Sequence, residues 1–168
     1  MSGEALERLA ACHRRIEAQL GLLETLAVQV AAARPDAALQ AAAAEMVRYF
    51  DTEGAQHHRD EDGDLFPLLR KLAAASGRGE VSAAIDELER EHATMDSQWA
   101  RLRDKLAAVA GGRSTAFGEG EVERFAWLYR RHLDRENLLV LPFAEEALST
   151  AERGSLAQRM SARRAAAQ

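Results

Sequence analysis

Very few helix-breaking residues interrupt this chain, and their positions constrain its fold more than any other feature. Only 11 glycines and 3 prolines occur in 168 residues, and alanine, the best helix former, is abundant. The breakers separate four long stretches that we predict to be helices, at about 4–33, 36–75, 81–110 and 121–148. We expect Pro67 to kink or end the second helix and Pro142 to interrupt the fourth, because proline lacks a backbone donor.

Apolar residues recur in each stretch at alternating steps of three and four, which places them on one helix face. All the predicted elements are helices, so the sequence predicts an all-α fold. Short connections between helices favour antiparallel neighbours. The predicted architecture is an up-down-up-down antiparallel four-helix bundle over residues 1–148. A capping box from Ser149 to Glu152 predicts a short C-terminal helix within residues 149–168. We expect its basic residues to be solvated: Arg153, Arg159, Arg163 and Arg164.

Composition excludes several classes of protein. A net charge of −5 argues against a dedicated nucleic-acid-binding protein. No apolar run approaches the roughly 20 residues of a membrane span, and the start MSGEALERL lacks the apolar segment of a secretory signal. The single cysteine, Cys12, excludes a disulfide framework and a cysteine-rich metal site. We therefore expect a cytoplasmic monomer or homodimer that contacts neither nucleic acid nor membrane.

Six polar side chains stand where the apolar faces would otherwise carry leucine. Each predicted helix contributes one histidine, and two helices add a glutamate four residues later. Residues i and i+4 share a helix face, so an imidazole and a carboxylate of one helix can reach one point in the bundle. Buried charges are costly unless they are paired or bind metal. The predicted metal ligands are His13, His57, Glu61, His92, His132 and Glu136.

The second and fourth predicted helices repeat one pattern. His57-x3-Glu61 and His132-x3-Glu136 are each preceded by a phenylalanine and followed by a proline at the same spacing. The chain therefore reads as two helical hairpins related by a pseudo-twofold axis, with two metal ions near that axis. Imidazole and carboxylate ligands without thiolate suit iron, manganese or zinc.

The segment HHRDEDGDLFP, residues 57–67, resembles the signature of hemerythrin-like HHE cation-binding domains of the bacterial type. HLDRE (132–136) with VLP (140–142) resembles its second copy, and Glu91-His92 resembles the Glu-His of its third helix. The resemblance covers roughly residues 5–148. It implies a four-helix bundle holding two iron ions joined by an oxo or hydroxo bridge, with manganese or zinc as alternatives.

The resemblance implies that Glu61 and Glu136 are carboxylates that bridge the two ions. His13 and His57 would bind one iron, and His92 and His132 the other. The chain departs from oxygen-carrying hemerythrins at Asp96, where they have a second histidine. It also departs at Glu136, which lies four residues after the histidine where they have an aspartate at five. These departures weaken the hypothesis of reversible oxygen carriage.

Several functions remain open at this point. The main hypothesis is a di-iron protein that binds or reacts with O₂, with a related small oxidant such as peroxide, or with NO, and whose redox partner is unknown. The alternatives are iron storage or donation, including iron handling for Fe–S repair, and a peroxide- or NO-consuming oxidoreductase. The sequence does not decide whether the protein is an enzyme.

Other residues have weaker cases as parts of the site. Glu17 and Asp96, each four residues after a histidine, are either edge carboxylates, ligands or acceptors for ring N–H groups. We expect His58 to be solvated or to support a ligand, with ligation as the alternative, and Cys12 to be a small buried residue, with a redox role as the alternative. Tyr129 is expected to pack at the edge of the site or to hydrogen-bond a ligand or bound oxygen. Core packing, or a dry pocket for a small apolar ligand, is expected of Phe50, Phe66, Trp99, Phe125 and Phe143. An ordinary charged surface, or a region that attracts Fe²⁺, is expected of Asp51, Glu53, Asp60, Asp62 and Asp64.

Overall fold

The computed structural model describes residues 4–166, and every regular element among them is helical. The predicted all-α class is therefore confirmed. The chain divides into two compact units. Unit 1 combines Met1–Arg14, Gln56–Arg90 and His132–Gln168, and unit 2 combines Arg15–Ala55 and Glu91–Arg131. The up-down-up-down order of a single bundle remains a prediction.

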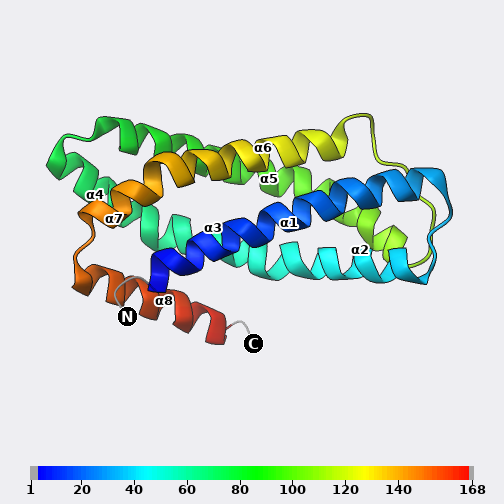
Figure 1. Cartoon of the computed structure of the whole chain (residues 1–168), viewed down its shortest axis with the longest axis horizontal. Helices are drawn as coiled ribbons and strands as arrows, with labels where there is room; N and C mark the ends of the chain where they lie inside the picture. The colour runs from blue at the N-terminus through cyan, green and yellow to red at the C-terminus, as the bar shows by residue number, and fades with distance from the viewer. Residues whose placement is uncertain (1–3, 167–168) are drawn as a thin grey trace. The chain divides into compact units, whose positions relative to one another are not determined.

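Eleven helical elements follow one another along the described residues (Figure 1). Eight are α-helices, and three, labelled η, are short π-helical segments with wider turns. In chain order they are α1 (Glu4–Ala32), α2 (Ala37–Tyr49), η1 (Phe50–Gly54), α3 (Ala55–Asp60), η2 (Glu61–Leu65), α4 (Phe66–Ser76), α5 (Gly79–Ala110), α6 (Glu121–Arg135), η3 (Glu136–Val140), α7 (Leu141–Ala147) and α8 (Thr150–Ala166). The predicted bounds of the first and third helices are met within two residues. The second and fourth predicted helices are instead divided into five and three elements.

The two prolines explain two of the three π-helical segments. Proline has no N–H, and its ring crowds the carbonyl four residues earlier. Immediately before each proline the helix widens by one residue. Phe66 N–H donates to the Glu61 carbonyl, and Leu141 N–H donates to the Glu136 carbonyl. The predicted interruptions at Pro67 and Pro142 are confirmed, and each is a wide turn that begins at a candidate ligand. The remaining segment, η1, has no proline shortly after it and was not predicted.

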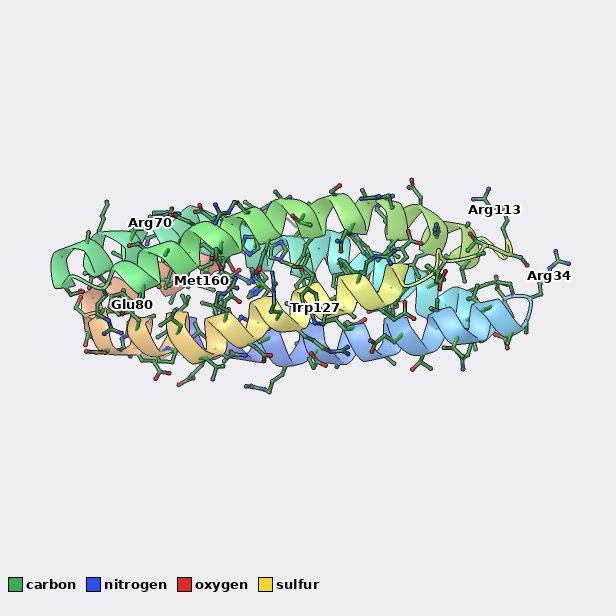
Figure 2. All side chains as sticks on the ribbon, turned by 90° about the horizontal axis from the view of Figure 1, so that it is seen from above. Arg34, Arg70, Glu80, Arg113, Trp127 and Met160 are labelled. Carbon is green, nitrogen blue, oxygen red and sulfur yellow. The ribbon has the colours of Figure 1, made fainter. Side chains whose placement is uncertain are left out.

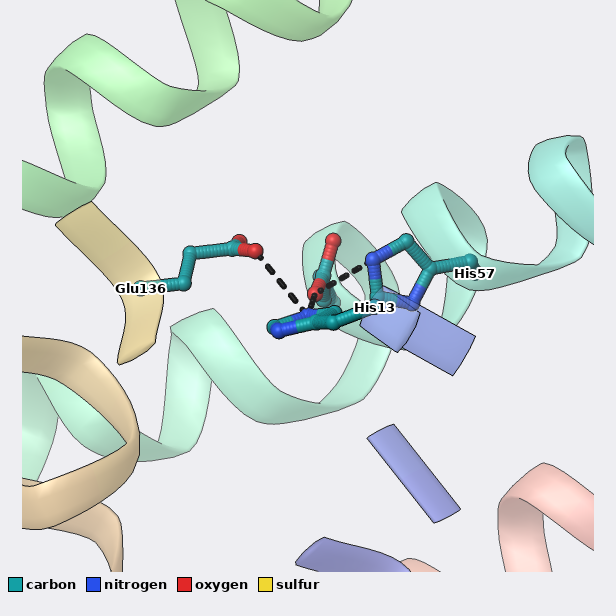
Figure 3. A group of neighbouring side chains, drawn as sticks. His13, His57 and Glu136 are labelled. Atoms are coloured by element: carbon teal, nitrogen blue, oxygen red, sulfur yellow. Dashed lines mark ion pairs between the residues drawn. The ribbon is translucent and has the colours of Figure 1, made fainter. Parts of the chain in front are cut away.

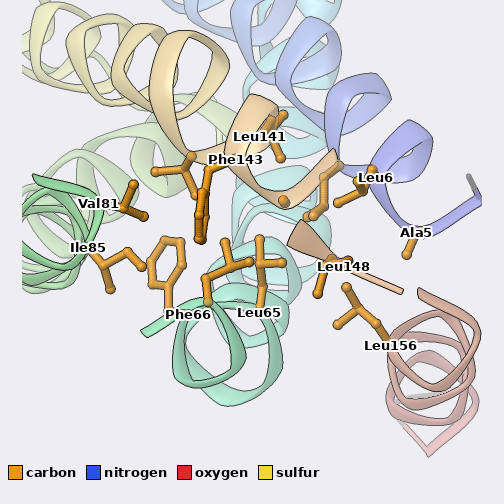
Figure 4. Packing of buried hydrophobic residues seen from close by; sticks show 14 of the residues in the cluster. Ala5, Leu6, Leu65, Phe66, Val81, Ile85, Leu141, Phe143, Leu148 and Leu156 are labelled. Atoms are coloured by element: carbon orange, nitrogen blue, oxygen red, sulfur yellow. The ribbon is translucent and has the colours of Figure 1, made fainter. Parts of the chain in front are cut away.

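The apolar core of unit 1 draws on α1, η2, α4, α5, η3, α7 and α8 (Figure 4). Phe66 and Leu69 are completely buried in it. Leu156 and Met160 of α8 are also completely buried. Burial of side chains of this size stabilises by about 1.5–3 kcal/mol each. The C-terminal helix is therefore an integral layer of unit 1.

Helix α8 begins with the predicted capping box. Ser149 N–H donates to Glu152 Oε2 at 2.8 Å, and Glu152 N–H donates back to Ser149 Oγ at 3.3 Å. Hydrogen bonds from the Ser149 hydroxyl and from its backbone N–H lower the pKa of the Glu152 carboxyl. The helix lies beside the start of α1 (Figure 1), where Arg8 Nη1 donates to Ser161 Oγ at 3.1 Å.

Unit 2 contains a separate aromatic cluster. Phe50 lies 4.7 Å from Trp99 and 5.8 Å from Phe125, and Tyr129 lies 5.3 Å from Phe125, between ring centroids. Trp99 is only partly buried, and its Nε1–H donates to Asp51 Oδ1 at 2.9 Å. Of the other aromatic residues that we grouped in the sequence, Phe66 and Phe143 belong to the apolar core of unit 1. The dry pocket for a small ligand remains a prediction.

The two turns of unit 2 each carry an exposed arginine. Arg34 and Arg113 point outward from its two turns (Figure 2). Trp127 is 60% exposed beneath the Arg131 guanidinium.

Within the described residues, no helix has the length and apolar character needed to cross a membrane. The cytoplasmic location and the monomeric or dimeric state remain predictions.

Candidate metal centre

Each His-x-x-x-Glu pattern is set at a junction between an α-helix and a π-helical segment of unit 1. His57 lies in α3 and Glu61 opens η2, while His132 lies near the end of α6 and Glu136 opens η3. One regular turn separates the two residues of each pair, so their side chains share a face. His57 Nε2 lies 3.2 Å from Glu61 Oε1, and His132 Nε2 lies 3.3 Å from Glu136 Oε1.

His13 of α1 joins the two patterns. Its Nε2 lies 3.2 Å from Glu136 Oε2 and 3.8 Å from Glu61 Oε1 (Figure 3). Its ring meets that of His57 edge-on, with centroids 4.9 Å apart. Ligating atoms of His13, His57, Glu61 and Glu136 all lie within 4.8 Å of one another, and so do those of Glu61, His132 and Glu136. The five residues are at most 4% exposed, so donor atoms converge on one dry point.

These donor atoms suit a metal ion better than they suit one another. Within the described part of the chain, His57 Nε2 and both Glu136 oxygens are buried without a hydrogen bond of good geometry. The ion pairs among the five residues span 3.2–3.8 Å, longer than a well-made charged hydrogen bond. Buried polar atoms left this way are unusual and need a further partner. A cation between them would satisfy several lone pairs together, and the donor set of imidazole and carboxylate fits iron, manganese or zinc.

The buried acidic and basic side chains of this group shift one another's pKa values. Burial disfavours a charged His13 ring, but Glu136 and Glu61 outweigh it and raise the pKa of His13 to about 10. Burial dominates at His57 and lowers its pKa to about 4. Burial and Glu61 both raise the pKa of Glu136, yet His132 and His13 lower it overall. At neutral pH, protonated His13 therefore lies beside the Glu136 carboxylate, and His57 stays neutral.

One polar residue at this site was missed from the sequence. Asn137 follows Glu136 in η3, and its Oδ1 lies 2.8 Å from His13 Nδ1. A carbonyl oxygen only accepts, so Nδ1–H is the donor. The only signal in the sequence was the position of Asn137 next to a candidate ligand.

The arginines of α8 contradict the predicted solvated tail. Arg164 Nη1 lies 2.7 Å from Asp60 Oδ2, and Arg163 pairs with the same carboxylate. Asp60 is completely buried and immediately precedes Glu61. Arg159 and Arg163 also bind Asp64, at 2.8 and 2.6 Å. Asp60 is therefore a buried anchor for α8 and Asp64 a partly buried one, and the prediction of an ordinary charged surface was wrong for both.

The residues with weaker cases as parts of the metal site differ in burial and in contacts. His58 is 7% exposed, with its ring centroid 5.9 Å from that of His57 and 6.1 Å from that of His132, so it supports the group and is not solvated. Glu17 is exposed and pairs with Arg130 at 2.8 Å in unit 2. Asp96 is exposed, and Cys12 is partly buried. Tyr129 belongs to the aromatic cluster of unit 2.

His92 lies on α5 in unit 2 and is 3% exposed. The preceding residue, Glu91, is also buried and pairs with Arg131 in the same unit. The assignment of His92 as a ligand remains a prediction from the sequence.

Comparison with known proteins agrees with this site. Residues 4–144 match the family model of the Hemerythrin HHE cation binding domain. The chain belongs to this family. It is also similar to an uncharacterised protein of Haemophilus influenzae, with 29% identity over 161 residues, 96% of this chain and 90% of the relative. The predicted family is confirmed, and its name describes a domain that binds cations.

Proposed function

We propose that the chain is a non-haem di-iron protein that binds or reacts with O₂, with a related small oxidant or with NO. One observation carries the proposal. Two His-x-x-x-Glu patterns and His13 bring buried nitrogen and oxygen donors within 4.8 Å in two overlapping groups. Two overlapping groups that share Glu61 and Glu136 favour two ions over one, because a shared carboxylate can bridge.

In this proposal each ligand has a separate part. His13 and His57 would hold one ion, and His132 with His92 would hold the other. Glu61 and Glu136 would bridge them and fix their separation. Bound iron would supply redox chemistry or reversible binding toward a small ligand.

The surrounding residues would control access and charge. The ligands are nearly inaccessible to solvent, so bulk water is excluded and electrostatic interactions within the site are strong. His13 must give up its Nε2 proton to bind an ion, since a metal ligand has to be deprotonated. Its contact with Asn137 leaves Nδ1–H in place.

Optical spectroscopy tests this function. The protein is loaded with Fe²⁺ without air, freed of excess metal and exposed separately to O₂ and NO. We expect a change in visible absorption with either gas that is absent in Glu136→Ala. The matched control is Glu89→Ala, which removes a carboxylate of unit 1 that pairs with Arg70 at the surface.

The outcomes separate the possible classes of function. A change that reverses on degassing supports binding. Irreversible oxidation followed by turnover with a reductant supports an oxidoreductase acting on O₂, peroxide or NO. Loaded protein that responds to neither gas and gives its iron to a chelator would contradict the proposal and favour storage or donation.

A further inference from the structure

We propose that Asn137 is a positioning residue that fixes the proton and the orientation of the ligand His13. The inference rests on the proposed metal site and goes beyond its ligand set. Asn137 lies on the outer side of η3 and is itself exposed. Its amide oxygen nevertheless reaches the buried ring of His13 at 2.8 Å.

The two ring nitrogens of His13 face adjacent residues of one segment. Nε2 lies 3.2 Å from Glu136 Oε2, and Nδ1 lies 2.8 Å from Asn137 Oδ1. Side chains of consecutive helical residues point in different directions, so Glu136 and Asn137 reach different edges of the His13 ring. Only one ring orientation places a nitrogen opposite each of them. A rotation of the ring by a half-turn would place carbon atoms opposite both acceptors.

The Asn137 contact also decides which nitrogen can bind a metal ion. A neutral imidazole carries its proton on one nitrogen and a lone pair on the other. Because Asn137 Oδ1 accepts a hydrogen bond and donates none, it selects the tautomer with Nδ1–H. The lone pair of Nε2 is then directed toward Glu61 and Glu136, where the ion would lie. Hydrogen bonds of this kind orient ligand histidines and raise their basicity.

The two copies of the repeat carry different residues at this position. Asn137 follows Glu136, whereas the residue that follows Glu61 is the acidic Asp62. The amide at 137 thus gives His13 an uncharged acceptor. A carboxylate there would add a further negative charge beside two buried glutamates.

The test uses Zn²⁺ as a diamagnetic probe and three variants. Asn137→Leu keeps the approximate size and removes the acceptor, and Asn137→Asp keeps an acceptor. Leu138→Ala is the matched control, because Leu138 is the next residue of η3 and is 80% exposed. Two quantities are measured, the Zn²⁺ affinity by competition with a chelator and the protonation of each His13 nitrogen by ¹H–¹⁵N NMR. Thermal unfolding of the metal-free variants verifies folding.

We expect Asn137→Leu to lower Zn²⁺ affinity about 10- to 100-fold and to lose the protected Nδ1–H signal. Asn137→Asp should retain that signal and recover most of the affinity, and Leu138→Ala should match the wild type. Wild-type affinity with an intact Nδ1–H signal in Asn137→Leu would refute the positioning role alone. A wild-type protein that binds neither Zn²⁺ nor Fe²⁺ would refute the metal site itself, and the positioning role with it.

Discussion

Glu61 and Glu136 begin two π-helical segments, η2 and η3, that share a backbone design and differ in what covers them. Both follow a histidine by one turn, and both end two residues before a proline in the first turn of the next helix. The outer side of η2 lies under α8, where Arg163 reaches within 3.3 Å of the place where Gly63 would carry a Cβ. The corresponding residue of η3 is Leu138, which is 80% exposed.

This difference shows that the repeated sequence fixes the position of the ligands but not the contacts that support them. Ligand spacing and proline position set where the glutamate points, and they are the same in both copies. The supporting contacts differ, since η2 is held by ion pairs to α8 and η3 by the contact of Asn137 with His13. One ligand geometry can therefore be stabilised in two chemically unrelated ways.

The largest expected effect tests whether the two copies are equal as ligands. Glu61→Ala and Glu136→Ala should each lower metal affinity by more than about 100-fold, beyond the loss of an outer hydrogen bond. Each removes donor oxygens shared by both groups of ligating atoms. Metal titration with a competing chelator measures the loss. Near wild-type affinity in either variant would show that only the other copy binds metal.

The second effect tests the ion pairs that are particular to η2. Arg163→Ala combined with Arg164→Ala leaves the completely buried Asp60 without its guanidinium partners. We expect the free energy of unfolding of the metal-free protein to fall by about 3 kcal/mol, as measured in urea. Arg59→Ala, an exposed change next to Asp60, is the control and should stay within about 0.5 kcal/mol. A double variant as stable as this control would show that α8 is held by apolar packing alone.

The third effect concerns His13, which contacts both copies. Its pKa is about 10 in the folded protein and near 6.5 when unfolded. The stabilisation from its proton is therefore complete below pH 6.5 and is lost as the pH rises to about 10. We expect the metal-free protein to lose about 1 kcal/mol of stability per pH unit across that range, from urea unfolding at several pH values. Glu136→Gln should flatten this dependence, and an equal slope in that variant would place the proton elsewhere.

The smallest effect tests the space beside η2. Gly63→Ala would bring a Cβ within 3.3 Å of Arg163 Nη2, the end of a flexible side chain. The improved helix propensity of alanine offsets the small displacement. We expect a change within about 0.5 kcal/mol in the free energy of unfolding. A loss above about 2 kcal/mol would mean that Arg163 cannot shift, and that α8 is fixed more rigidly than its ion pairs require.

The sequence predicts the helical class, most helix ends and the capping box, because these depend on local residues. It also selects the side chains that meet in unit 1, since i and i+4 positions on one helix face stay together through a regular turn. It does not predict the π-helical segments, because one wider turn leaves the apolar periodicity almost unchanged. Asp60 and Asn137 were misjudged or missed because their importance comes from partners more than a hundred residues away, Arg163 and His13.

The central claim is that the two copies together hold two metal ions. The most direct measurement is the iron content of protein loaded with Fe²⁺ without air and freed of unbound metal. We expect two iron ions per chain in the wild type, and strongly reduced iron in both Glu61→Ala and Glu136→Ala. One ion or none in the wild type would contradict the paired site, and the buried histidines and glutamates would then need another explanation.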